Sequence, residues 1–126
     1  MPSNCYLIFT LKKGTVLAEL LSFDIDGTME FGDPPGGVTV EMVRGAKAAG
    51  YIVGSCSDRP VSNQKDLWQR NELEVSFTVL KHELDSVKAE FEAETYTHIG
   101  DTELDRHYAV MSGFRFVKID AYQDEP

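Results

Sequence analysis

Short apolar runs alternate with amphipathic segments along most of this chain, and that alternation restricts the fold to a narrow class. Strands are predicted at 17–23, 51–55, 75–80, 95–99 and 114–119, and helices at 39–49, 62–70, 83–93 and 102–111. Because the links between them are short, successive strands lie parallel and are joined by right-handed crossovers. The pattern predicts an α/β fold, a three-layer Rossmann-like sandwich with a mostly parallel sheet of about five strands.

The chain length limits the domain organisation. With 126 residues, the chain is long enough for one domain with a modest core and too short for two. Residues 17–126 form the predicted domain. Residues 1–16 alternate in polarity around Lys12, Lys13 and Gly14, which predicts a small hairpin or an extended arm before that domain. The end of the chain, 120–126, is predicted to be a frayed acidic tail.

Charge and cysteine content narrow the class of protein. The formal net charge of −9 argues against a nucleic-acid partner, because affinity for a polyphosphate backbone comes from Lys and Arg. Cys5 and Cys56 are far apart and have no Cys or His at ligand spacing, so neither a disulfide framework nor a zinc site is predicted. With no signal or spanning segment recognised, we expect a cytoplasmic protein without a membrane partner.

Two carboxylates follow the first predicted strand. Asp24 and Asp26 are one residue apart and precede Gly27 and Thr28. Side chains two positions apart on an extended backbone point the same way, so the two acids repel each other unless a cation or a shared proton neutralises them. Such a pair also occurs in solvated turns and at helix N-caps, and the residues after the other strands decide between these interpretations.

Chemically competent residues follow three other predicted strands as well. They are Ser57, Asp58 and Arg59 after the second strand, Lys81 after the third, and Gly100, Asp101 and Asp105 after the fourth. The carboxyl ends of parallel strands share one edge of a sheet, where open α/β folds bind their ligands. A hydroxyl, an ammonium group and several carboxylates suit a phosphoryl group accompanied by a hard cation. The sequence therefore predicts a phosphoryl-transfer site at this edge.

The order and spacing of these residues resemble the four motifs of the haloacid dehalogenase superfamily, a large group of aspartyl-phosphate phosphotransferases. Asp24-Ile25-Asp26-Gly27-Thr28 is similar to the first motif, Ser57 with Arg59 to the second, Lys81 to the third, and Gly100-Asp101 with Asp105 to the fourth. The resemblance covers residues 17–119. Its first and fourth motifs are specific, whereas the second and third gain weight only from their place in the series.

The resemblance implies a Mg²⁺-dependent phosphatase. Asp24 would attack phosphorus, Asp26 would protonate the leaving oxygen and then activate water, and Lys81 would neutralise the nucleophile. The implied metal residues are Asp24, Asp26 through its carbonyl, Asp101, and Asp105 either as a ligand or behind one. The implied phosphoryl-binding residues are Gly27, Thr28, Ser57, Asp58 and Arg59.

Some assignments stay open at this point. Lys88 competes with Lys81 for the third motif, although Lys81 follows a strand directly and Lys88 lies more than a turn into the next helix. Arg59 either binds substrate or pairs with a nearby carboxylate. The histidines lack metal-ligand spacing and are predicted to be structural or surface residues: His82, His98 and His107.

No cap domain is predicted, because 29–50 and 60–80 leave room only for a helix with a loop or a strand. The chain thus resembles the capless subgroup, whose members often act on large phosphorylated substrates or complete their sites by oligomerising. We expect a small metabolite or sugar phosphate as substrate, with a macromolecular phosphate as the alternative. The loop at 30–37 is placed to act as a flap, and a neighbouring subunit of a homo-oligomer would supply the remaining wall.

Three other functions are alternatives to the phosphatase. One is a receiver-like signalling domain that accepts a phosphoryl group from a partner, but such domains have no use for a general acid at Asp26. Another is a catalytically idle binding module. The third is a dehalogenase, whose halide route needs no proton donor at that position.

Overall fold

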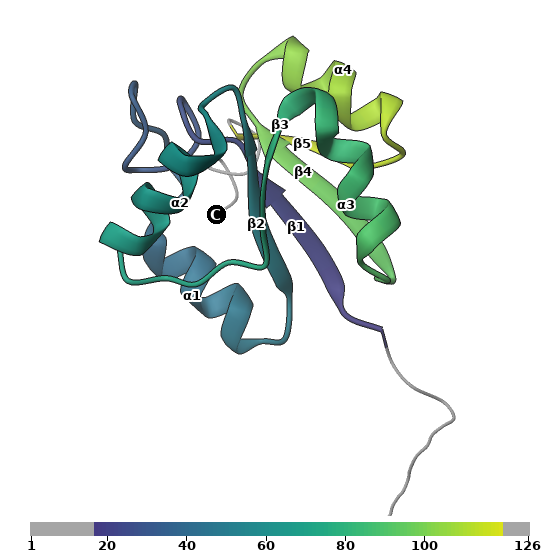
Figure 1. Cartoon of the computed structure of the whole chain (residues 1–126), viewed down its shortest axis with the longest axis horizontal. Helices are drawn as coiled ribbons and strands as arrows, with labels where there is room; N and C mark the ends of the chain where they lie inside the picture. Colours follow the sequence, from purple (N-terminus) through teal and green to yellow (C-terminus); the bar gives the residue numbers. More distant parts are fainter. Residues whose placement is uncertain (1–16, 120–126) are drawn as a thin grey trace, which may run out of the picture.

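The computed structural model describes residues 17–119, which form one open sheet with helices on both faces (Figure 1). The strands are β1 (Glu19–Phe23), β2 (Ile52–Ser57), β3 (Phe77–Leu80), β4 (Thr95–Gly100) and β5 (Arg115–Lys118). The helices are α1 (Val40–Ala48), α2 (Val61–Arg70), α3 (Leu84–Glu90) and α4 (Glu103–Met111), with a 3₁₀ turn, η1 (Lys81–Glu83), between β3 and α3. The arm or hairpin predicted at 1–16 and the tail predicted at 120–126 lie outside the described residues.

The sheet confirms the predicted fold class. Its strands are all parallel, in the order β3-β2-β1-β4-β5, and each crossover between successive strands contains a helix. The described residues therefore form a Rossmann-like three-layer α/β sandwich, and no cap domain interrupts them. None of their helices is long and apolar enough to cross a membrane.

The strand order reverses at β1. From β1 the chain moves outward through β2 to β3, then returns to the other side of β1 with β4 and β5. The helix after β1 and the helix after β4 consequently lie on opposite faces of the sheet. This reversal opens a crevice beyond the carboxyl ends of β1 and β4, which is where open α/β sheets bind their ligands.

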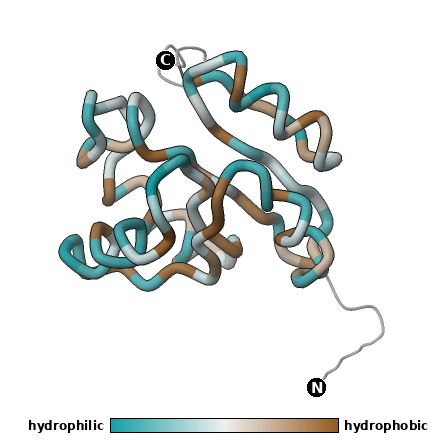
Figure 2. The backbone as a smooth tube through the Cα atoms, turned by 45° about the horizontal axis from the view of Figure 1, so that its top comes forward, coloured by the Kyte–Doolittle hydropathy of each residue, from teal (hydrophilic) through white to brown (hydrophobic). Residues whose placement is uncertain are grey.

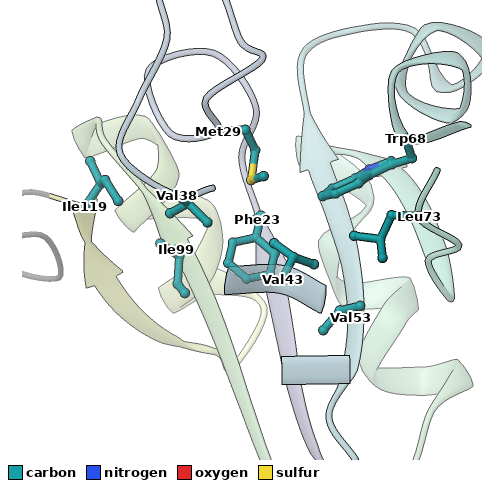
Figure 3. Packing of buried hydrophobic residues seen from close by; sticks show 9 residues of the cluster. All are labelled: Phe23, Met29, Val38, Val43, Val53, Trp68, Leu73, Ile99 and Ile119. Carbon is teal, nitrogen blue, oxygen red and sulfur yellow. The ribbon is translucent and has the colours of Figure 1, made fainter. Parts of the chain in front are cut away.

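Two apolar clusters attach the helices to the sheet, α1 and α2 on one face and α3 and α4 on the other (Figure 1). The α1/α2 cluster consists of Phe23, Met29, Val38, Val43, Val53, Trp68, Leu73, Ile99 and Ile119 (Figure 3). The α3/α4 cluster consists of Leu20, Cys56, Phe77, Leu84, Val87, Ala109 and Phe114. Figure 2 shows the hydropathy along the backbone, where hydrophobic and hydrophilic residues alternate along the helices.

The central strand β1 contributes to both clusters. Leu20 packs in the α3/α4 cluster and Phe23 in the α1/α2 cluster, because side chains alternate between the faces of a strand. By the same alternation, the buried Ser22 lies on the face of Leu20. Ser22 is in register with His98 on the neighbouring β4, so two polar side chains meet inside the sheet–helix interface.

Most predicted elements agree with the structure to within two residues at each end. Thr39, the first residue of the helix predicted at 39–49, is the N-cap of α1, since its Oγ1 accepts a hydrogen bond from Met42 N at 3.1 Å. The helix predicted at 83–93 is wrong at its end, because α3 stops at Glu90. There Phe91 becomes extended and its ring packs 5.8 Å from that of Phe77, while its carbonyl accepts a hydrogen bond from the Tyr96 hydroxyl.

Candidate active site

Asp24 and Asp26 follow the carboxyl end of β1 and line the same cavity, but they have different partners. Asp24 is 4% exposed, and its Oδ1 accepts a hydrogen bond from Ile25 N at 2.8 Å. The Asp26 side chain is 37% exposed, and its Oδ1 accepts hydrogen bonds from Arg59 Nη2 and Asp33 N, both at 2.8 Å. One carboxylate is therefore buried, and the other is held in an ion pair at the rim.

These environments shift the two carboxyl groups in opposite directions. Burial, reinforced by the neighbouring Asp105 carboxylate, raises the pKa of Asp24 from 3.8 to about 8, although Lys81 opposes the shift. For Asp26, burial works in the same upward direction but is outweighed, and the hydrogen bonds from Arg59 and Asp33 lower the pKa. In the metal-free protein Asp26 is consequently the more strongly ionised member of the pair.

Lys81, the first residue of η1, lies among three carboxylates. Its Nζ atom is 3.6 Å from Asp24 Oδ2, 3.6 Å from Asp58 Oδ2 and 3.4 Å from Asp105 Oδ1. Burial alone would lower the pKa of Lys81, but the three acids raise it overall. Lys81 is therefore a fixed, charged ammonium group next to the buried Asp24 side chain that follows β1.

Lys88, the competing lysine, points elsewhere. Its Nζ donates a hydrogen bond to Gly113 O at 3.3 Å and lies 5.3 Å from the centre of the Tyr96 ring. Of the two lysines, Lys81 is the one in contact with Asp24.

The turn from β4 into α4 carries two further acids close to Asp24. Asp24, Asp101 and Asp105 each offer a carboxylate oxygen, and these three atoms lie within 4.8 Å of one another. Gly27 has a φ of 78°, and a Cβ atom there would collide with the Asp101 carboxylate. Glycine at this position thus permits both the turn after β1 and the close approach of Asp101.

Asp105 is completely buried, and both of its carboxylate oxygens already have donors. Oδ2 accepts hydrogen bonds from Thr102 Oγ1 at 2.9 Å and from the backbone N–H groups of Asp101 and Thr102, each at 3.3 Å. Oδ1 lies 3.0 Å from His98 Nε2 and also faces Lys81 Nζ. These contacts indicate that Asp105 orients the turn and the lysine.

The turn after β2 is fixed by a buried polar network that the sequence analysis did not identify. Ser57, the last residue of β2, accepts a hydrogen bond from Arg59 N at 3.1 Å through its Oγ. Gln64 of α2 donates to Arg59 O at 2.8 Å, and its Oε1 accepts from Ser55 Oγ at 2.7 Å. Trp68 Nε1 in turn donates to Ser55 Oγ at 3.0 Å. Ser57 and Arg59 are therefore held by the core of the α2 face.

The loop at 30–37 lies against the segment that follows β1. Gly27 N donates a hydrogen bond to Pro34 O at 2.6 Å, and Pro34 lines the cavity. The ring of Phe31 packs edge-on against Trp68, with ring centres 5.1 Å apart. The loop predicted as a flap is thus attached to the core at one point and reaches the cavity at another.

The structure gathers most of the predicted site residues around one small cavity of about 230 Å³. Its lining consists of Asp24, Asp26, Pro34, Ser57, Asp58, Lys81, Asp101 and Thr102. Gly27, Thr28, Arg59 and Asp105 do not line it. Thr28 is fully buried, and its Oγ1 has no hydrogen-bond partner among the described residues.

The charge and the ligand types of the cavity lining suit a divalent cation. Asp24, Asp26, Asp58 and Asp101 bring four carboxylates to the cavity, whereas Lys81 is its one ammonium group. Carboxylate oxygens are the ligands that hard cations such as Mg²⁺ prefer. A cation beside Asp24 would also favour the charged form of this buried group.

A larger cavity of about 680 Å³ lies between α2 and β3, where Trp68, Leu73 and Phe77 contribute to its wall. None of the predicted site residues lines it. The chemistry-bearing residues therefore gather at the smaller cavity, beyond the strand ends.

His98, predicted to be a structural or surface residue, lies next to the site, which the sequence did not indicate. It is 1% exposed, whereas His82 and His107 are exposed. The signal in the sequence is the place of His98 two residues before Gly100 in a predicted strand, where a buried imidazole requires polar partners.

Comparison with known proteins provides no family assignment. No protein-family model, no curated protein and no solved structure matches this chain. The class that the structure itself defines is a three-layer α/β protein with a parallel sheet. At its strand reversal this protein carries a lysine-bearing acidic cavity and a carboxylate cluster able to hold a metal ion.

Proposed function

We propose that this chain is a Mg²⁺-dependent phosphatase of the haloacid dehalogenase type, hydrolysing a phosphate monoester through an aspartyl phosphate on Asp24. The observation that carries the proposal is the position of Asp24. It is a buried carboxylate at the strand reversal, 3.6 Å from Lys81 Nζ and within reach of Asp101. A buried acid next to further acids and one fixed ammonium suits a nucleophile that becomes charged when a cation binds.

The chemistry proceeds in two displacements. A carboxylate oxygen of Asp24 attacks phosphorus and the bond from phosphorus to the ester oxygen breaks, while Asp26 gives a proton to that leaving oxygen. Water then attacks the phosphorus of the acyl phosphate, Asp26 takes a proton from this water, and the bond to Asp24 breaks to release inorganic phosphate. Lys81 offsets the negative charge that accumulates at Asp24 and the phosphoryl oxygens.

The metal ion is assigned to Asp24 and Asp101, with the carbonyl of Asp26 as a further ligand and Asp105 orienting the turn behind them. When bound, it supplies Lewis-acid stabilisation of the phosphoryl oxygens and offsets the charge of the acids. Ser57 at the cavity wall is the hydroxyl placed to donate to a phosphoryl oxygen.

Arg59 controls the protonation of Asp26. In the ligand-free protein the ion pair keeps Asp26 ionised, yet the first displacement needs a proton on it. Arg59 does not line the cavity but pairs with Asp26, which does. A substrate bound beside Asp26 would therefore compete for the guanidinium, weaken the ion pair and allow Asp26 to take up a proton. Arg59 thereby serves both of the roles considered for it, pairing with a carboxylate and binding the substrate.

The size of the cavity limits how much of a substrate it can hold. A volume of about 230 Å³ accommodates a phosphoryl group with its cation, whereas pockets for whole drug-sized ligands start at about 300 Å³. The leaving group therefore stays outside. A small metabolite or sugar phosphate in the cytoplasm is the favoured substrate, with a phosphorylated macromolecule as the alternative, and a second subunit would cover the open mouth.

The test is turnover of 4-nitrophenyl phosphate by wild type, Asp24→Asn and Asp85→Asn, with Mg²⁺ and with EDTA. Asp85 makes the matched control because it undergoes the same chemical change on an exposed position of α3. We expect activity in wild type and Asp85→Asn only, lost in EDTA. Wild-type turnover in folded Asp24→Asn would contradict the nucleophile assignment. Fluoroberyllate with Mg²⁺, which mimics an aspartyl phosphate, should raise the melting temperature of wild type but not of Asp24→Asn.

The Asp26–Arg59 ion pair favours one other function, a receiver-like phospho-accepting domain. A carboxylate held ionised is a poor proton donor, which suits a lasting acyl phosphate better than rapid turnover. Incubation with acetyl phosphate and Mg²⁺, followed by intact-protein mass measurement over time, separates the two. A phosphorylated species that persists for minutes supports the receiver, and one that hydrolyses at the rate of turnover supports the phosphatase.

A further inference from the structure

A continuous chain of buried polar contacts runs from the middle of the sheet to the candidate nucleophile. Ser22 Oγ lies 2.9 Å from His98 Nδ1, and His98 Nε2 lies 3.0 Å from Asp105 Oδ1. The same Asp105 oxygen is 3.4 Å from Lys81 Nζ, which reaches Asp24. Each of these residues is at most 6% exposed.

The roles of the atoms in this chain follow from Asp105. Its carboxylate accepts hydrogen bonds at Oδ2 from Thr102, so the group is an anion that needs donors at Oδ1 as well. His98 Nε2 therefore carries the hydrogen and donates it to Asp105 Oδ1. In a neutral ring this leaves Nδ1 to accept a hydrogen bond from the Ser22 hydroxyl, and the register of β1 and β4 places Ser22 opposite His98.

We propose that His98 is a positioning residue, which holds the Asp105 carboxylate at the angle that places Lys81 against Asp24. The effect of His98 on turnover rests on the phosphatase proposed above, whereas its hold on Asp105 does not. His98 touches neither the cavity nor the metal-binding oxygens of Asp24 and Asp101, and it acts only through Asp105.

A purely packing role does not explain this imidazole. His98 lies on the face of β4 that packs against α4, with its ring 6.4 Å from Phe116, where an apolar side chain would need no partners. Burying an imidazole, a hydroxyl and a carboxylate is favourable only when each satisfies another. Here Ser22 of β1 contacts His98 of β4, and His98 contacts Asp105 of α4. Asp105 in turn contacts the ammonium group of Lys81.

The first experiment compares His98→Leu with His98→Gln. Leucine fills similar space without a donor, whereas the glutamine amide can donate to Asp105. We expect kcat for 4-nitrophenyl phosphate to fall on the order of 10- to 100-fold in His98→Leu with little change in KM, and to recover at least in part in His98→Gln. Ile99→Val is the control, because it trims the adjacent buried residue of β4 on the opposite face and leaves the polar chain intact.

A double-mutant cycle with Asp105→Asn tests the route. If His98 acts through Asp105, adding His98→Leu to Asp105→Asn lowers kcat no further than Asp105→Asn does alone. Multiplied losses in the double variant would overturn the proposal. So would a kcat for folded His98→Leu equal to that of Ile99→Val.

A final measurement needs no activity and no variant at His98. Two-dimensional NMR of protein labelled with ¹⁵N in its histidine rings reports which ring nitrogen carries hydrogen. We expect hydrogen on His98 Nε2, and a change of the His98 signals in Asp105→Asn. A neutral ring with its hydrogen on Nδ1 alone would overturn the proposal, because Asp105 would then face a lone pair. An inactive wild type with hydrogen on Nε2 would instead refute only the phosphatase.

Discussion

Lys81 Nζ lies 3.6 Å from Asp24 Oδ2, and both side chains are less than one tenth exposed. Lys81 comes from the 3₁₀ turn after β3 and Asp24 from the end of β1, so the contact spans the width of β2 at the edge of the sheet. An ammonium group held there by three carboxylates cannot move away without leaving buried charge unpaired. The contact therefore makes Lys81 a structural requirement of the acidic cavity as well as the proposed catalytic cation.

Alanine variants should show which of the two lysines, Lys81 or Lys88, supports turnover. We expect Lys81→Ala to lower turnover of an aryl phosphate by about 10²- to 10³-fold, because a preorganised charge is removed from the transition state. Lys88→Ala removes a lysine whose partners are Gly113 and Tyr96, so its turnover should stay near that of wild type. Steady-state kinetics with both variants measure this, and the reverse ranking would assign the third motif to Lys88.

The raised pKa of Asp24 predicts an unusual stability profile for the metal-free protein. Its pKa is 3.8 ordinarily and about 8 in the fold, so between these values the folded state binds more protons than the unfolded state. Stability in EDTA should consequently fall as pH rises from about 4 to about 8. Asp24→Asn removes this titration, and its advantage over wild type in denaturant unfolding should therefore grow from pH 5 to pH 8.5. An equal difference at both pH values would contradict the shift.

The lowered pKa of Asp105 does not blur that measurement. Its contribution to stability is present above the ordinary pKa of a carboxyl group and is lost only as pH falls below it. Both proteins carry Asp105 in its charged form at pH 5 and at pH 8.5. Saturating Mg²⁺ should abolish the pH-dependent difference, because the cation favours the ionised form of Asp24 in wild type.

Asp26→Ala should distinguish an acid–base role from a structural one. General acid catalysis is typically worth about 10² to 10⁴ in rate, but a nitrophenolate leaving group needs little protonation. We therefore expect a much greater loss of turnover with an alkyl phosphate than with 4-nitrophenyl phosphate. Equal losses on the two substrates would indicate that Asp26 acts through the metal or the loop it binds at Asp33.

Three glycine substitutions separate backbone strain from crowding at the site. Gly27→Ala combines a positive φ with a collision against Asp101, Gly50→Ala has a positive φ in open space, and Gly45→Ala in α1 has neither. We expect Gly45→Ala to stabilise the protein by about 0.4–1 kcal/mol and Gly50→Ala to destabilise it. Gly27→Ala should be the most destabilised of the three and should also bind Mg²⁺ more weakly. Thermal unfolding and Mg²⁺ titration calorimetry measure both effects, and unchanged Mg²⁺ affinity would contradict the role assigned to Asp101.

Much of the fold could be predicted from the sequence because its signals are local. The Thr39 cap, the glycine after α1 and the apolar strands each act within a few residues, and their predicted elements agree with the structure. The end of α3 could not be predicted in this way. It depends on Phe91 packing against Phe77 and accepting a hydrogen bond from Tyr96, which lies in the following strand.

The candidate site could likewise be predicted only in part. Spacing along the chain predicted six of the eight residues that line the cavity, because parallel strands end at one edge of the sheet. Pro34 and Thr102 were not among the predicted site residues. Spacing also could not predict the partners behind the cavity lining. Whether Asp26 pairs with Arg59, or His98 with Asp105, depends on side-chain directions across neighbouring elements, which only the packed structure determines.

The central position of β1 in the sheet should make its backbone amides exchange with solvent slowly. β1 is hydrogen-bonded along both sides, to β2 and to β4, whereas β3 and β5 form the edges of the sheet. Amides of central strands exchange with solvent only through the largest opening events, whereas edges and loops open locally. Asp24 is thus joined to the slowest-exchanging part of the molecule, while Lys81 follows an edge strand. Deuterium uptake should therefore reach the turn that carries Lys81 well before it reaches β1, the strand that precedes the proposed nucleophile.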